Sequence, residues 1–284
     1  MEKREMFIRK AREQVKAALM SRDMLLSGVA KSIEDLNRVI NLLGERLEDW
    51  YGIYFPEMKL EDRIKYAQLA LYIDRLNPDL KEMASIVGQK KAEEIAQIAG
   101  KSLGASLEES DLEQCRRFAG SIIELDKLRE NFEKYQNGLA NQLCPNTSIV
   151  AGPEIAAKLV AHVGSLARLS VLPASTIQVL GAEKALFKHL KNRRIKPPKH
   201  GIIFQHPKIS GSPKSVRGRI ARALAAKIAI ATKADAFTKR DISSELLTDF
   251  EKRYEQIMED YKKEKGKAEL SRPKVVNSKP GSSE

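Results

Sequence analysis

Residues 33–50, IEDLNRVINLLGERLEDW, carry the pattern that decides the fold. Apolar residues recur there at alternating spacings of three and four, as at the a and d positions of a coiled-coil heptad. These residues are Ile33, Leu36, Ile40, Leu43, Leu47 and Trp50. The register extends back to Ile8, with breaks at Arg12 and Arg22. Pro56 ends the pattern, so the stretch predicts a single helix of roughly fifty residues.

A helix of this kind cannot bury its apolar seam alone, so it must pack along another long helix or along a second copy of the chain. Two shorter helices are predicted at 60–76 and 79–100, followed by a long one at 109–141. Together they predict a coiled-coil hairpin with a helical tip. The same stripes would fit an ordinary bundle core, but the length of the two helices favours a dimerisation arm. We assign the dimer contact to four apolar residues of the second long helix: Ile122, Leu125, Phe132 and Tyr135.

The second half of the sequence is also predicted to be helical. The helical repeats lie at about 153–163, 174–192, 215–231 and 241–265. No run of alternating β-branched residues is long enough for a sheet. The expected fold class is therefore all-α. It comprises a coiled-coil arm over residues 1–148, a compact helical domain over 149–266 and a disordered polar tail over 267–284.

Positive charge is concentrated in one part of the sequence. The formal net charge is +12 over 284 residues, but residues 184–240 hold 16 Lys and Arg against the single acid Asp235. So many like charges repel one another in a compact fold, which favours a polyanionic partner over a merely solvated face. The apolar residues beside them are largely alanines rather than the bulky residues of a membrane-surface helix. Nucleic acid is therefore the favoured partner, and no membrane contact is expected.

A polar stripe on the predicted helix 174–192 is the first candidate binding surface. Its members recur at spacings of three and four, which places them on one helix face: Gln178, Gly181, Lys184, Lys188 and Lys191. Gly181 costs about 1 kcal/mol relative to alanine inside a helix, so we expect a partner to approach the backbone there. Glu183 is expected to orient Lys184 or to accept a hydrogen bond from the partner.

The long connection after this helix is the second candidate surface. It is about two dozen residues long and rich in Pro and Gly, and connections of that length are usually functional or disordered. Guanidinium groups bind phosphate through two parallel hydrogen bonds, and an exposed His200 ring could stack on an unpaired base. The basic residues that enter the connection are Arg193, Arg194, Lys196 and Lys199, and those that leave it are Lys214, Arg217, Arg219 and Arg222.

The sequence contains no catalytic pattern that we recognise. It lacks the GxxxxGK[ST] phosphate loop, the GxGxxG dinucleotide loop and the HExxH metal motif. Cys115 and Cys144 have no metal-binding spacing and are interpreted as reduced packing residues. We therefore expect no enzyme activity, no cofactor and no metal site. The lack of a secretion signal and of a long apolar run predicts a soluble, intracellular protein.

Three stretches carry a family resemblance: GPEIAAKLVAHVGSLARLSVLPASTIQVLGAEKALFKHLK (152–191), PPKHGIIFQHP (197–207) and RGRIARALAAKIAIATKADAF (217–237). They resemble the Nop domain of archaeal box C/D ribonucleoprotein core proteins, which are relatives of the eukaryotic nucleolar Nop proteins and of a spliceosomal protein. Residues 21–57, SRDMLLSGVAKSIEDLNRVINLLGERLEDWYGIYFPE, are similar to the coiled-coil dimerisation module of that family.

The resemblance implies a non-enzymatic scaffold of the particle that guides rRNA 2′-O-methylation, an rRNA-processing role. In this family the Nop domain binds a kink-turn guide RNA only together with a small kink-turn-binding protein homologous to ribosomal proteins, and the arm forms a homodimer. The family's GAEK motif corresponds here to Gly181, Ala182, Glu183 and Lys184, and its ALFR motif to Ala185, Leu186, Phe187 and Lys188. Lys188 replaces the family's arginine, which loses the bidentate fork. Further RNA contacts are implied for Arg193, Arg194, Lys199, His200, Arg217, Arg219 and Lys227.

The resemblance has one departure. Archaeal relatives begin with an α/β domain that binds the methyltransferase fibrillarin, whereas this sequence starts directly at the arm helix. The sequence is then either truncated or that of a short paralogue, so the resemblance does not extend to fibrillarin recruitment by this chain. The expected location is the cytoplasm of an archaeal-type cell. The alternative function is a coiled-coil protein-interaction adaptor that binds no RNA and whose basic domain binds acidic proteins.

Overall fold

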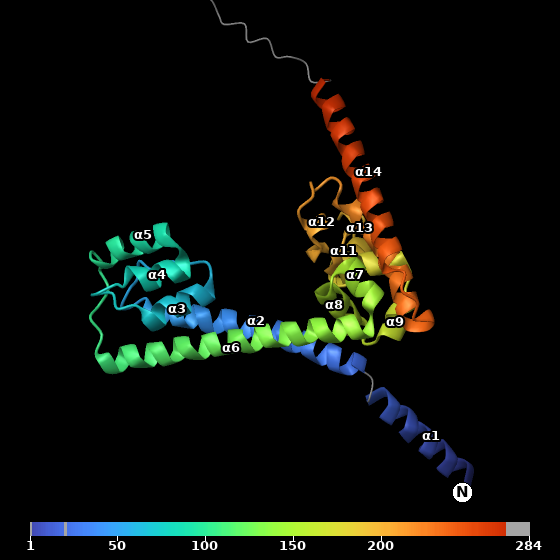
Figure 1. The fold of residues 1–284 in the computed structure, drawn as a ribbon, viewed down its shortest axis with the longest axis horizontal. Helices are drawn as coiled ribbons and strands as arrows, with labels where there is room; N and C mark the ends of the chain where they lie inside the picture. Colours follow the sequence, from blue (N-terminus) through green and yellow to red (C-terminus); the bar gives the residue numbers. More distant parts are fainter. Residues whose placement is uncertain (1, 20–21, 271–284) are drawn as a thin grey trace, which may run out of the picture. The chain divides into compact units, whose positions relative to one another are not determined.

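The computed structural model describes residues 2–19 and 22–270, which form helices and connecting loops (Figure 1). No strand occurs in this described part of the chain. The all-α prediction is therefore confirmed. The C-terminal helix α14 (Ser243–Leu270) continues into the segment expected to be a disordered tail, and the rest of that tail lies outside the described residues.

The chain divides into two compact units, and the division differs from the expected one. One unit spans Gly28–Gly138, and the other joins the residues up to Ser27 to those from Leu139 onward. The expected boundary after residue 148 falls inside α7 (Pro145–Ala151), whose last two residues are buried in the core of the second unit. The Pro and Gly residues on either side of α7 therefore delimit a short buried helix rather than a linker.

The unit Gly28–Gly138 is built on two long helices, α2 (Arg22–Tyr51) and α6 (Glu109–Leu143). Figure 1 shows these helices side by side, with three short helices at one end of the pair. The short helices are α3 (Arg63–Tyr72), α4 (Leu80–Val87) and α5 (Gln89–Ala99). The predicted helix 79–100 is thus divided in two at Gly88, whose φ of +85° is favourable only for glycine.

The heptad pattern is confirmed as the buried seam of α2. Ile33, Ile40 and Leu47 are at most 6% exposed, and the last two cluster with Ile122 of α6. Trp50 departs from the pattern, because its side chain is 52% exposed and meets the Phe118 ring edge to face. Helices α1 (Glu2–Leu19) and α2 cover the predicted long helix, apart from residues 20 and 21 between them, which lie outside the described part of the chain.

Ile122 cannot contribute to a dimer surface, because its side chain is fully buried in the core of its own chain. Beyond Ile122 on α6, Leu125 and Phe132 are half-buried, and Leu128 and Tyr135 are 40% and 49% exposed. These four residues recur at spacings of three and four and therefore share one side of the helix. This face stays the predicted dimerisation surface, without Ile122.

The second unit is organised around α13 (Arg217–Lys233), against which α7, α14 and α10 (Ala174–Val179) pack. The predicted core stripe of Ile220, Leu224 and Ile228 is fully buried in α13. The remaining elements of the unit include α8 (Pro153–Val163), α9 (Leu166–Ser170), α11 (Glu183–Lys191), the 3₁₀ turn η1 (Ile202–Gln205), α12 (Pro207–Ser210) and the π-helical turn η2 (Ala234–Thr238).

Asp235, the single acid of the basic segment, is buried in η2 and does not neutralise the surface cations. Its carboxylate accepts hydrogen bonds from the backbone N–H and the side-chain amide of Asn146, at 3.0 and 2.8 Å. It also accepts from the backbone N–H and the hydroxyl of Thr147, at 2.8 and 2.7 Å. Because the first N–H groups of a helix have no partner within the helix, Asp235 anchors the start of α7 to the end of α13.

Candidate nucleic-acid interface

The predicted helix 174–192 is two helices, α10 and α11, which are separated by a turn at residues 180–182. Gly181 adopts a φ of +84° in this turn, a backbone conformation that favours glycine. A Cβ at this position would come within 2.7 Å of the Ile202 side chain. The turn and the contact with Ile202 therefore explain Gly181 without a ligand. The prediction that Gln178 and Lys191 belong to one helix face is wrong, because they lie on different helices.

Glu183 fixes the turn at the start of α11. Its Oε1 accepts a hydrogen bond from the Gly181 N–H at 2.7 Å and lies 2.8 Å from Nε2 of His162. Partial burial raises the pKa of the Glu183 carboxyl, but these hydrogen bonds outweigh burial and hold the pKa below its usual value. Ala182 occupies the N-cap position without contributing a side-chain hydrogen bond. The motif residues Gly181, Ala182 and Glu183 thus position the exposed side chain of Lys184.

Helix α11 presents side chains of two kinds to solvent. None of its nine residues is buried. Lys184, Lys188 and Lys191 are exposed, and so are Phe187 and Leu190, by 61% and 52%. A helix at the surface of a domain normally buries one apolar stripe, so the exposed Phe187 and Leu190 leave α11 with apolar groups available for contact. The combination of cations and apolar groups suits a joint contact with nucleic acid and protein.

The connection after α11 is held against α10 by hydrogen bonds to the backbone of the connection. Gln178 donates from Nε2 to the carbonyl oxygen of Lys199 at 2.7 Å, and its own carbonyl accepts the N–H of Gly201 at 2.9 Å. The side chains of Arg193, Arg194 and Lys199 remain exposed. The connection is therefore ordered by its neighbours, with its predicted cations on the outside.

Arg217, the first residue of α13, binds the end of this connection through its guanidinium group. Its Nε and Nη2 donate to the carbonyl oxygens of Ser212 and Ser210, both at 2.8 Å. Its guanidinium lies 5.3 Å from the ring centre of Phe204, which stacks on His200 at 4.4 Å. Burial and then the charge of Arg217 lower the pKa of His200. Arg217 and His200, both expected to bind RNA, are thus engaged by contacts within the chain.

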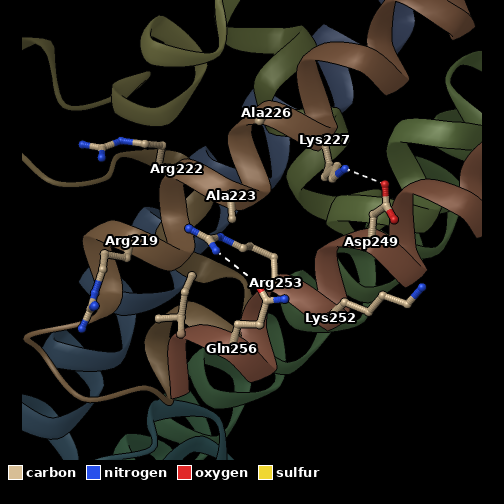
Figure 2. A pocket seen from close by; sticks show the side chains of 10 residues that line it. Arg219, Arg222, Ala223, Ala226, Lys227, Asp249, Lys252, Arg253 and Gln256 are labelled. Atoms are coloured by element: carbon tan, nitrogen blue, oxygen red, sulfur yellow. Dashed lines mark hydrogen bonds and ion pairs between the residues drawn. The ribbon is translucent and has the colours of Figure 1, made fainter. Parts of the chain in front are cut away.

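A groove of about 640 Å³ lies between α13 and α14 (Figure 2). Five cations line it: Arg219, Arg222, Lys227, Lys252 and Arg253. Sequence reasoning missed Lys252 and Arg253, because the segment after residue 240 is nearly neutral when its charges are summed. A usable signal was the spacing of Asp249, Lys252, Arg253 and Gln256, which places them along one side of a helix.

Two of the groove cations on α13 have carboxylate partners on α14. The Lys227 Nζ lies 3.0 Å from Oδ2 of Asp249, and this pair is drawn in Figure 2. The Arg219 guanidinium pairs through two nitrogens with both carboxylate oxygens of Glu264, at 3.3 and 3.2 Å. Partly exposed ion pairs of this kind contribute about 0–1 kcal/mol, so a phosphate group can exchange with them at little cost.

The residues of this surface lie in a part of the chain that matches a known protein family. The Nop family, described as "snoRNA binding domain, fibrillarin", matches residues 32–256. The chain belongs to the Nop family. The resemblance inferred from the sequence motifs is therefore confirmed, and the match includes α11, the connection after it and the α13 side of the groove.

Relatives in the Nop family are longer than this chain. An uncharacterized NOP5 family protein of Methanocaldococcus jannaschii is 42% identical over 252 residues, which cover 88% of this chain and 60% of the relative. Nucleolar protein 58 of Aspergillus oryzae is 33% identical over 234 residues, which cover 81% of this chain and 40% of the relative. The chain thus spans less than two thirds of the length of these two proteins.

A solved structure shares the fold of this Nop chain. The crystal structure of a fibrillarin/Nop5p complex contains a chain that matches with a TM-score of 0.54 and 29% sequence identity. The match covers 89% of this chain and 78% of that chain. Within the described residues of this chain, no three His, Cys, Asp or Glu side chains are grouped as metal ligands, and no helix is long and apolar enough to cross a membrane.

Proposed function

We propose that this chain is a non-enzymatic RNA-binding scaffold of a box C/D-type ribonucleoprotein that guides rRNA 2′-O-methylation. Its Nop domain binds a kink-turn RNA together with a small kink-turn-binding protein related to ribosomal proteins. Its arm forms a homodimer that holds two such halves. Membership of a family described as a snoRNA binding domain supports the RNA part of this proposal.

The observation that carries the proposal is the exposure of α11. Its lysines supply the charge that an RNA backbone requires, and its exposed Phe187 supplies an apolar contact that RNA phosphates do not require. The helix lies within residues 32–256, which match a family described as a snoRNA binding domain, and this favours RNA over an adaptor that binds only acidic proteins, the alternative function. One helix that offers both kinds of contact suits a partner pair of RNA and protein.

The test is the affinity for a fluorescently labelled kink-turn RNA at about 0.15 M salt, measured with and without the small protein. We expect weak binding alone and a sharp increase when the small protein is added. Lys184→Ala with Lys188→Ala should weaken RNA binding about tenfold or more, because two phosphate contacts are lost. Phe187→Ala should reduce only the increase that the small protein produces. Lys262→Ala with Lys263→Ala removes two exposed lysines from α14 instead of α11 and is the matched charge control.

Two outcomes would contradict parts of the proposal. Equal RNA affinity with and without the small protein would exclude a composite site. Failure to retain structured RNA under either condition would favour the adaptor function instead.

The dimer is tested separately by light scattering at micromolar concentration. We expect twice the 31.8 kDa mass of the chain. Leu128→Glu with Tyr135→Glu should produce monomers, because both exposed apolar groups lie on the proposed contact face of α6. Lys134→Glu, an exposed position outside that stripe, should leave the dimer intact. A wild-type mass of a single chain would contradict the dimer.

A further inference from the structure

The groove between α13 and α14 carries more positive charge than its own carboxylates neutralise. Arg222, Lys252 and Arg253 line it without forming a salt bridge to any described residue. Arg253 donates a hydrogen bond to the neutral side chain of Gln256 at 3.1 Å, as Figure 2 shows. The groove thus keeps three cations without a carboxylate partner, which electrostatically suits a ligand with several negative charges.

The shape of the groove favours a nucleic-acid backbone over a protein segment. Its apolar lining consists of Ala223, Ala226 and the buried Ile257, so it offers no large exposed apolar group. Protein partners are bound mainly through buried aromatic and large apolar anchors, which this groove lacks. Phosphate binding requires only correctly placed cations, and Arg guanidinium forks match phosphate geometry.

Lys199 connects this groove to the surface at α11. Its aliphatic side chain packs over the first turn of α13, because a Cβ on Gly218 would lie 3.5 Å from the Cβ and Cδ of Lys199. Gln178 holds the backbone of Lys199 in place through the bond at its carbonyl oxygen. Arg222 follows Gly218 by four residues, about one helical turn further along α13. Lys199 therefore lies against the side of α13 that carries Arg222, about one turn before the groove.

We propose that the groove between α13 and α14 is a second phosphate-binding site, which extends the contact of the RNA that α11 engages. Arg222, Lys252 and Arg253 bind phosphates of that RNA. The paired Lys227 and Arg219 form the walls of the groove. The inference rests on the proposed RNA-binding function and adds to it a site on α14.

The experiment compares two triple variants of the full chain that remove the same number of cations from the same two helices. The groove variant is Arg222→Ala, Lys252→Ala and Arg253→Ala. The control variant is Lys233→Ala, Lys262→Ala and Lys263→Ala, all exposed and outside the groove. The probe is a labelled kink-turn RNA with a long duplex stem, in the presence of the small kink-turn-binding protein. The affinity is measured over a series of salt concentrations.

The groove variant should bind about tenfold or more weakly, and the slope of log affinity against log salt should fall by roughly 2–3, since each lost phosphate contact contributes about 0.7–0.9. The control variant should change the affinity about twofold at most. A second groove variant, Ala226→Glu, adds a carboxylate to the floor while keeping every native cation. Ala226→Glu should weaken RNA binding as well. Because it removes none of the cations, a loss of affinity shared with the triple variant would then be attributed to the groove rather than to a folding defect.

The outcomes separate this inference from the proposed function. Wild-type binding with unchanged affinity in both groove variants would overturn the groove site and leave RNA binding intact. Equal loss in the groove and control variants would also overturn it, because the effect would then follow total charge. Absence of RNA binding by the wild-type chain would overturn the proposed function and the groove site together.

Discussion

Helices α11 and α13 are both rich in cations, yet they differ in how they use them. α11 buries none of its residues, whereas α13 buries eight and forms the centre of its unit. On α13, Arg217 donates to backbone carbonyls, and Arg219 and Lys227 pair with carboxylates of α14. The lysines of α11 form no salt bridge within the described residues. A cation is thus most available to a ligand where the fold supplies no partner of its own.

The largest expected effect is a loss of stability in the unit built around α13, and it is expected from Asp235→Ala in η2, directly after α13. This change leaves four donors of Asn146 and Thr147 without their acceptor in a buried site, so the free energy of unfolding should fall by about 3–5 kcal/mol. Urea denaturation followed by circular dichroism measures it. Asp260→Ala, at an exposed position of α14, is the control and should change stability by about 0.5 kcal/mol or less. Equal effects of the two changes would contradict the anchoring of α7 to α13.

Effects of intermediate size are expected from two reciprocal substitutions, one on α13 and one on α11. Arg217→Lys keeps the charge but cannot reach both carbonyls of Ser210 and Ser212, so stability should fall by about 1–2 kcal/mol while RNA affinity stays near that of wild type. Lys188→Arg should raise RNA affinity and leave stability unchanged. The exposed guanidinium gains a bidentate phosphate contact without touching the core.

Thermal melting and RNA titration of both variants measure the two quantities side by side. If Arg217→Lys lowered RNA affinity and left the melting temperature unchanged, Arg217 would bind RNA rather than stabilise the fold. Unchanged affinity in Lys188→Arg would show that α11 does not hold its phosphates through this position.

The sequence was sufficient where structure follows from local periodicity. The seam of α2 and the buried stripe of Ile220, Leu224 and Ile228 both follow from helical spacing. It was insufficient where a residue's role depends on distant neighbours. Gly181 is a helix breaker by its backbone conformation and by the contact with Ile202, which is 21 positions away, and we interpreted it as a ligand contact.

The pairing of charges also depends on neighbours that are distant in the sequence. The acids that pair with the basic segment come from α14, so a count within the segment could not find them. For the same reason the count missed Lys252 and Arg253, whose helix is nearly neutral in total but basic on the side that lines the groove. Spatial proximity, which composition does not encode, decides which charges are free.

The smallest expected effect concerns the connection between α11 and α13 and depends on pH. His206 Nδ1 accepts the N–H of Lys208 at 3.2 Å and so caps α12. Burial and then the charge of Lys208 lower the pKa of His206 below its ordinary value of 6.5. The unfolded chain therefore binds this proton more readily than the folded chain, so the stabilisation is complete above about pH 6.5 and is lost as the pH falls through the folded-state pKa.

His206→Asn tests this, because asparagine keeps an acceptor for the cap and does not titrate. The free energy of unfolding, measured at about pH 7.5 and about pH 5, should fall less on acidification in the variant than in wild type. The pH dependence should be reduced rather than abolished, since the pKa of His200 is lowered in the same direction. Lysines remain charged over this range, so acid loosens the connection beneath α11 without removing its positive surface. Identical pH dependence in variant and wild type would show that the cap of α12 contributes nothing to the order of the connection.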